Sequence, residues 1–149
     1  MIDDLITLDT TGDGLDDSVL CFDENGGFAI VSDYNYDGNF EQLQYFSGMD
    51  YWGNPTETLV MVDTDNDGNL DTGIAESFNE FGEVIAHAEF NDYDQDGEFD
   101  MMKIYQDTTG AGDFDVVTFM HSDNSDSPVL QKIDMHVDQT GDHTPDISV

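Results

Sequence analysis

The segment Asp63-Thr64-Asp65-Asn66-Asp67-Gly68-Asn69-Leu70-Asp71 directly follows the run Thr58-Leu59-Val60-Met61-Val62. The run has the β-branched and apolar composition of a β-strand, and the Asp-Asn-Asp-Gly sequence at 65–68 is typical of a sharp turn. A strand that ends in such a turn predicts a β-hairpin. Repetition of this pair of features along the chain determines the predicted fold.

The segment at 63–71 recurs at 92–100 as Asp92-Tyr93-Asp94-Gln95-Asp96-Gly97-Glu98-Phe99-Asp100 and, with changes, at 9–17 and 33–41. Weaker copies occupy 107–115 and 138–146. Self-similarity at a regular spacing is typical of a repeat architecture. We therefore interpret residues 1–149 as a single domain of repeated hairpins.

Short segments rich in Val, Ile, Phe, Tyr and Met lie between the turns and are predicted strands: 18–22, 28–31, 58–62, 84–90, 99–105, 114–120 and 130–137. No stretch of ten or more residues has apolar residues at the helical spacing. The prediction is an all-β fold, an antiparallel meander of about ten or eleven short strands. An open meander, a barrel and a β-solenoid-like or propeller-like array stay open. A stacked array, in which each hairpin contacts mainly its neighbours, is favoured.

Charge and composition exclude several function classes. The 149 residues contain 35 Asp+Glu against 2 Lys+Arg, a formal net charge of −33. Nucleic-acid binding needs patches of Lys and Arg, so it is excluded. No apolar run approaches the roughly 18 residues of a membrane span, so membrane insertion is not expected. The single cysteine, Cys21, excludes an intrachain disulfide.

The acidic positions of the repeated segment have the spacing of a calcium-binding loop. Calcium takes six to eight oxygen ligands, which carboxylates at positions 1, 3, 5 and 9 and the backbone carbonyl of position 7 can supply. Glycine at position 6 permits the chain reversal. Without a cation, carboxylates this close together repel one another. We predict about four calcium sites, or five to six if the weaker copies also bind.

The predicted metal ligands occupy the odd-numbered positions of each copy. They are Asp9, Thr11, Asp13, Leu15, Asp17, Asp33, Asn35, Asp37, Asn39, Glu41, Asp63, Asp65, Asp67, Asn69, Asp71, Asp92, Asp94, Asp96, Glu98, Asp100, Asp138, Thr140, Asp142 and Asp146. In the copy at 107–115 Ala111 stands at position 5, which favours a plain turn there.

The pattern Asp-x-Asp-x-Asp-Gly-x-x-Asp, with Leu70 or Phe99 at position 8, resembles the calcium loops of FG-GAP repeats in integrin-type β-propellers. It is also similar to the Asp-Gly repeats of bacterial secreted proteins. The copies at 9–17 and 33–41 depart from it, for example through Asp16 at the apolar position. The resemblance covers about a third of the chain, and it implies calcium. EF-hands and dockerins would need flanking helices, which are not expected here.

These patterns favour a calcium-stabilised β-repeat module with a structural or adhesive role and no enzymatic activity. The alternative is a calcium-dependent carbohydrate- or protein-binding module that uses the aromatic turn at 45–55, with Tyr45, Tyr51 and Trp52 as ligand contacts. A salt-adapted acidic surface is a third interpretation. The residues 1–5 lack signal-peptide features, which fits either a cytoplasmic protein or a piece of a secreted chain. We expect an extracellular or cell-surface location.

Overall fold

The computed structural model describes residues 6–97, 99–121, 131–137 and 147–148, the last two segments through their backbone alone. Every regular element in these residues is a β-strand. Within the same residues there is no helix that could cross a membrane.

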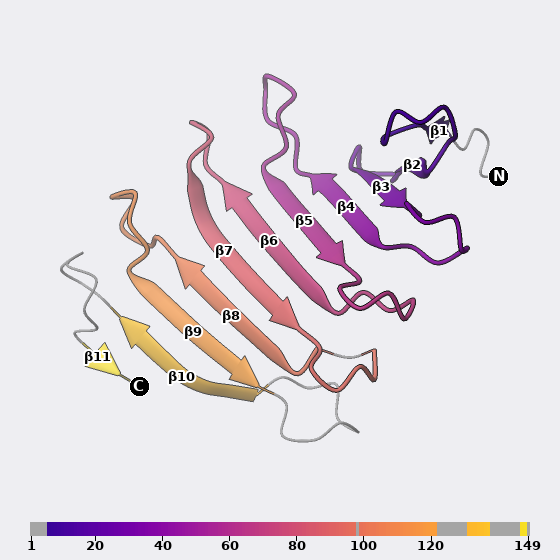
Figure 1. Cartoon of the computed structure of the whole chain (residues 1–149). Helices are drawn as coiled ribbons and strands as arrows, with labels where there is room; N and C mark the ends of the chain where they lie inside the picture. The colour runs from indigo at the N-terminus through magenta and orange to yellow at the C-terminus, as the bar shows by residue number, and fades with distance from the viewer. Residues whose placement is uncertain (1–5, 98, 122–130, 138–146, 149) are drawn as a thin grey trace.

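Eleven strands form one sheet, and their order in the sheet is their order in the sequence (Figure 1). They are β1 Ile6–Leu8, β2 Ser18–Phe22, β3 Phe28–Ser32, β4 Gln42–Ser47, β5 Glu57–Val62, β6 Thr72–Phe78, β7 Val84–Asn91, β8 Met101–Gln106, β9 Val116–His121, β10 Gln131–Val137 and β11 Ile147–Ser148. All neighbouring strands are antiparallel. The predicted all-β antiparallel meander is confirmed.

The sheet is open and is not closed into a barrel, with β1 and β11 as its two outer strands. Each strand contacts only the strands before and after it in the sequence. This is the one-dimensional arrangement expected for a stacked array of hairpins.

Strand boundaries differ from the prediction where acidic residues close a turn. The segments predicted at 99–105 and 114–120 begin two residues later, at Met101 and Val116. The residues before them, Asp100 and Asp115, accept hydrogen bonds from the backbone of the preceding loop. These hydrogen bonds hold Asp100 and Asp115 in the loops, so each strand begins one residue after the aspartate.

Successive turns alternate between the two ends of the strands. The connections β1–β2, β3–β4, β5–β6 and β7–β8 all lie at one end, which we call the acidic end, and they contain the copies at 9–17, 33–41, 63–71 and 92–100. The connection β8–β9, which contains the copy at 107–115, lies at the opposite end. The meander thereby places the four acidic loops in a row.

The described side chains form no apolar core. Through residues 6–97 and 99–121 no hydrophobic side chain is buried, because a single layer has no second layer against which to pack. The buried polar residues are Asp17, Ser18, Ser32, Asp63, Asp71, Asp92 and Asp115. Most of these lie where a strand meets an acidic loop, so the best-packed parts of this molecule are the loop bases.

Candidate metal centre

Three of the acidic loops bring carboxylate oxygens within 4.8 Å of one another. The three clusters are Asp33, Asp37 and Glu41; Asp63, Asp65 and Asp71; and Asp92, Asp94 and Asp96. Each belongs to a different β-hairpin at the acidic end. At this separation one cation can contact all three oxygens of a cluster, so each cluster could hold a metal ion.

The aspartate at position 1 organises each loop by accepting hydrogen bonds from the backbone. In the loop 63–71, Asp63 accepts from the N–H of Asn66 at 2.6 Å and from that of Gly68 at 2.8 Å. Burial disfavours the charged form of Asp63, but these bonds outweigh it and hold the pKa of the carboxyl below its usual range. The carboxylate is therefore ionised and fixed in position before any cation binds.

The acid at position 9 closes the loop from its other side. Asp71 accepts from the N–H of Thr64 at 2.8 Å, and Asp17 accepts from the N–H of Thr11 at 2.9 Å. Burial would raise the pKa of Asp17, but bonds from Thr10, Ser18 and Thr11 together lower it strongly. Positions 1 and 9 thus stabilise the turn itself.

The loop 107–115 shows that the turn does not require acids at positions 3 and 5. Asp107 accepts from the N–H groups of Gly110 at 2.6 Å and Gly112 at 2.7 Å, and Asp115 accepts from Thr108. Positions 3 and 5 of this loop are Thr109 and Ala111. The sequence interpretation attributed all four acidic positions to the metal, whereas two of them already have a role in the turn.

In the loop 92–100 the carboxylates at positions 3 and 5, Asp94 and Asp96, lie close to the other acids of the loop. Asp94 has a raised pKa because of burial and because of the negative charges on Asp100, Asp96 and Asp92. Asp94 therefore experiences net negative charge from its own loop, which a positive charge would compensate. A bound cation would supply it.

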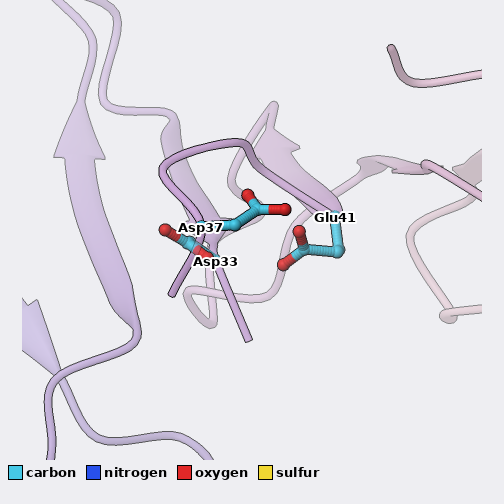
Figure 2. A group of neighbouring side chains, drawn as sticks. All are labelled: Asp33, Asp37 and Glu41. Atoms are coloured by element: carbon cyan, nitrogen blue, oxygen red, sulfur yellow. The ribbon is translucent and has the colours of Figure 1, made fainter. Parts of the chain in front are cut away.

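The cluster in the loop 33–41 contains two oxygens without a hydrogen-bond partner in the described part of the chain. They are Oδ1 of Asp33 and Oε1 of Glu41, and both atoms are buried. Figure 2 shows the carboxylate of Asp37 directed toward that of Glu41 across the loop. Buried carboxylate oxygens are normally paired, and a cation among these three residues would pair them.

Several of the predicted metal ligands lie outside the three carboxylate clusters. Asp9, Asp13 and Asp17 do not form a comparable cluster among the described residues. Asp67 and Asp100 lie in clustered loops but outside the three-residue groups, and the side-chain oxygen of Asn35 accepts from the N–H of Asp37 at 2.8 Å. In the loop 9–17 Thr11 donates to Asp9 at 3.5 Å.

The residues at position 7 contribute N–H groups to the loops. The N–H of Leu15 donates to Asp13, that of Asn39 donates to Asp37, and that of Asn69 donates to Asp67, each at 2.8 Å. The predicted ligands Glu98, Asp138, Thr140, Asp142 and Asp146 lie outside the described residues.

Position 4 of the loops has a role that the sequence analysis did not predict. Tyr36, Asn66 and Gln95 have positive φ angles of 61°, 66° and 61°, a conformation uncommon for residues other than glycine. Each side chain reaches the preceding acidic loop. Tyr36 donates to Asp13 at 3.3 Å, Asn66 accepts from Asn35 at 3.0 Å, and Gln95 donates to Asp65. The four loops are linked into one row by these bonds.

The three aromatic residues that were predicted to contact a ligand do not all lie in the same turn. Tyr51 and Trp52 lie in the β4–β5 turn, 93% and 79% exposed, with their rings edge to face at 5.1 Å. Tyr45 belongs to β4 and donates its hydroxyl to Asp23 at 2.5 Å. A hollow between the β4–β5 and β6–β7 turns is lined by Trp52 and by Phe81, which the sequence did not single out.

Comparison of the chain with protein-family models, curated proteins and solved structures finds no match. The properties of the site therefore follow from its own residues.

Proposed function

We propose that this chain binds calcium at its acidic end and that the bound ions stabilise the β-sheet. The observation that carries the proposal is the pair of buried oxygens on Asp33 and Glu41 that find no hydrogen-bond partner among the described residues, within the cluster that Asp37 completes. A charged oxygen without a partner is costly in a folded protein, and a cation removes that cost.

The ligand chemistry favours a hard cation. All three clusters consist of carboxylates alone, with neither His nor Cys among their members. Such oxygen-only sets suit calcium, magnesium and manganese better than zinc or copper. Calcium is preferred over magnesium because it accepts many carboxylates in an irregular cage, whereas magnesium keeps most of its water.

The role proposed for calcium is structural. No hydrophobic side chain is buried in residues 6–97 and 99–121, so burial of apolar area provides little of the stability of an isolated sheet. A ligand that binds only the folded state stabilises it by about 2.7 kcal/mol at a concentration 100 times its Kd. For a structural or adhesive module outside the cell we expect a Kd in the range of extracellular calcium-binding modules, about 10⁻⁴–10⁻³ M.

The test combines thermal unfolding with isothermal titration calorimetry. We expect chelator to lower the Tm, millimolar calcium to restore it, and magnesium to restore it less. Asp37→Asn should remove one ion from the stoichiometry. Asp113→Asn changes the charge equally in the loop 107–115, where Ala111 stands at position 5, and it should leave the stoichiometry unchanged. A Tm that is equal in chelator and in calcium contradicts the proposal.

A second candidate function, ligand binding by the aromatic turn, is favoured by the hollow beside Trp52. Trp52 and Phe81 supply apolar walls, and Asp50, Asn54 and Glu80 supply polar groups on the same lining. The apolar faces of a pyranose ring stack on aromatic rings, while its hydroxyls bond to carboxylates and amides. We therefore propose a carbohydrate as the ligand class.

Trp52 is the single tryptophan, so its fluorescence reports directly on this hollow. We expect neutral oligosaccharides from a glycan panel to change the emission, and Trp52→Ala or Phe81→Ala to abolish binding with the Tm unchanged. Phe22→Ala removes another exposed aromatic side chain that does not line the hollow, and it serves as the control. Binding that survives both hollow variants would place the carbohydrate elsewhere.

A further inference from the structure

The two faces of the sheet differ in chemistry. Residues paired in register on neighbouring strands share a face. One such row runs across the sheet through Val31, Leu43, Met61, Phe90, Met102 and Met120. A second row on the same side is displaced from the first by two residues along each strand. It runs from Cys21 on β2 to Thr118 on β9 and contains no charged residue. We call this side the apolar face.

The other side of the sheet is polar over its second half. Glu89 is paired in register with Lys103, and His87 lies 3.1 Å from Glu76. The ammonium of Lys103 lies over the rings of Tyr105 and Phe119, at 5.2 and 5.4 Å from their centroids. The charged groups of this side therefore have partners within the sheet, whereas the two central rows of the apolar face contain no charged residue from β2 to β9.

Gly73 lies on the apolar face between Met61 and Phe90, with which it is paired in register. A Cβ atom on Gly73 would lie 3.2 Å from Cγ of Met61 and 3.5 Å from Cδ2 of Phe90, so these two side chains close over the glycine. A shallow hollow beside them is lined in part by Leu59, Ala75 and Phe90. Such a surface can receive a side chain from a facing sheet.

We propose that two copies of this chain pack through their apolar faces to form a β-sandwich. From β2 to β9 the face spans eight strands, and at about 4.8 Å between strands and 3.4 Å per residue it covers on the order of 700 Å². Stable interfaces bury about 800 Å² per partner. A second copy offers an apolar surface of the same size and the same twist, and a two-fold axis applies the same patch on both sides.

The position of the acidic groups determines the orientation of the pair. The acidic loops lie beyond the strand ends, and Glu57, at the margin of the apolar face, is bonded to Ser47 at 2.9 Å. We place the two-fold axis in the plane of the interface and perpendicular to the strands. The strands of the two copies then run in opposite directions, and the acidic end of one copy lies over the opposite end of its partner. The two acidic ends are then about 20 Å apart, beyond the screening length of roughly 8 Å at physiological salt.

The salt dependence of the association distinguishes this dimer from a complex with a cationic partner. Screening weakens repulsion between two copies that each carry −33, so the dimer should strengthen as salt rises. A complex with a basic protein would weaken under the same change. Because packing through the apolar face does not involve the metal clusters, the dimer should form in chelator as well as in calcium.

Sedimentation equilibrium at low and high salt tests the proposal, each in chelator and in calcium. We expect twice the monomer mass for the wild type, the monomer mass for Leu59→Glu on the apolar face, and twice the monomer mass for the matched Val60→Glu on the other face of the same strand. Both side chains are half-buried in the single sheet. Circular dichroism confirms that each variant is folded. A monomeric wild type, or equal masses for the two variants, overturns the proposal.

Cys21 provides a second measurement that needs no variant. Its thiol is exposed in the single sheet and lies on the apolar face, paired in register with Ala29. Its rate of modification by a maleimide should fall several-fold as protein concentration rises through the dimerisation range. A rate that is independent of concentration across that range overturns the proposal even if a dimer is present, because the dimer would then use another surface.

Discussion

Nδ2 of Asn35 donates a hydrogen bond to Oδ1 of Asn66 over 3.0 Å, although the two residues are 31 positions apart. The bond joins the loop 33–41 to the loop 63–71. Equivalent bonds join Tyr36 to Asp13 and Gln95 to Asp65, each from position 4 of one loop to an odd-numbered position of the loop before it. A cation that orders one loop therefore also restricts a side chain of its neighbour.

We predict that the acidic loops bind calcium cooperatively and that Gln95→Gly weakens the cooperativity. Glycine tolerates the positive φ angle of this residue, so the variant removes the bond to Asp65 without straining the backbone. Calorimetric titration should give the same number of ions with a lower Hill coefficient. A Hill coefficient equal to that of the wild type would show that the bond between Gln95 and Asp65 does not couple the loops, and a wild-type coefficient of one would show that the loops bind independently. Gly12 occupies position 4 of the first loop, so glycine is already accepted at this position.

Asp94→Asn should stabilise the metal-free protein and destabilise the calcium-bound one. The raised pKa of Asp94, caused by burial and by the charges of Asp100, Asp96 and Asp92, means that the folded state disfavours its ionised form. The amide removes this repulsion but also removes a ligand. Thermal unfolding in chelator should give a higher Tm than that of the wild type, and unfolding in saturating calcium a lower one. A lower Tm in both conditions would indicate a purely structural role for Asp94.

Tyr45→Phe should raise the pKa of Asp23 toward the ordinary value. The hydroxyl of Tyr45 bonds to the carboxylate of Asp23 and, with the N–H groups of Asn25 and Gly27, holds its pKa low. Carboxyl chemical shifts followed by NMR from pH 2 to 6 measure this directly. The pKa of Asp50 depends on bonds from Asn54 and should not change, which makes it the internal control. An unchanged pKa of Asp23 would show that the backbone bonds alone are responsible.

Metal-free protein should lose stability when the pH falls below about 4, the ordinary pKa range of aspartate. Asp107 has a lowered pKa, mainly because its carboxylate accepts a hydrogen bond from the N–H of Gly112. Burial would raise the pKa of Asp115, but hydrogen bonds from Thr108 and Thr109 outweigh burial and lower it. A carboxyl whose folded-state pKa is depressed contributes stability above its unfolded pKa, and this is lost as the pH falls through the folded value. Urea unfolding in chelator at several pH values measures the effect. Asp107→Asn should reduce the slope below pH 4, and an unchanged slope would exclude Asp107 as a source.

Local sequence predicted seven of the eleven strands. It missed the short outer strands β1 and β11 and, within the sheet, β4, Gln42–Ser47, and β6, Thr72–Phe78. Gln42, Gln44 and Glu76 make β4 and β6 look polar, although in β4 the glutamines alternate with Leu43 and Tyr45, as in a strand with one solvated face. In this single-layer sheet both sides of each described strand border solvent, so polar residues are tolerated on either side. The count of about ten or eleven strands was nevertheless confirmed, because the turns mark the strands from both ends.

The sequence by itself determined the properties that arise within nine consecutive residues. These include the turn after each strand, the spacing of the acids and the all-β class, since turn chemistry and strand composition act locally. Only the tertiary structure decided which acids meet, because that depends on the register between strands. It placed four loops in a row at one end and 107–115 at the other, joined Asn35 to Asn66, and left one apolar face uncovered. An antiparallel meander returns every second turn to the same end, so the neighbours of a loop in space lie a whole hairpin away in sequence.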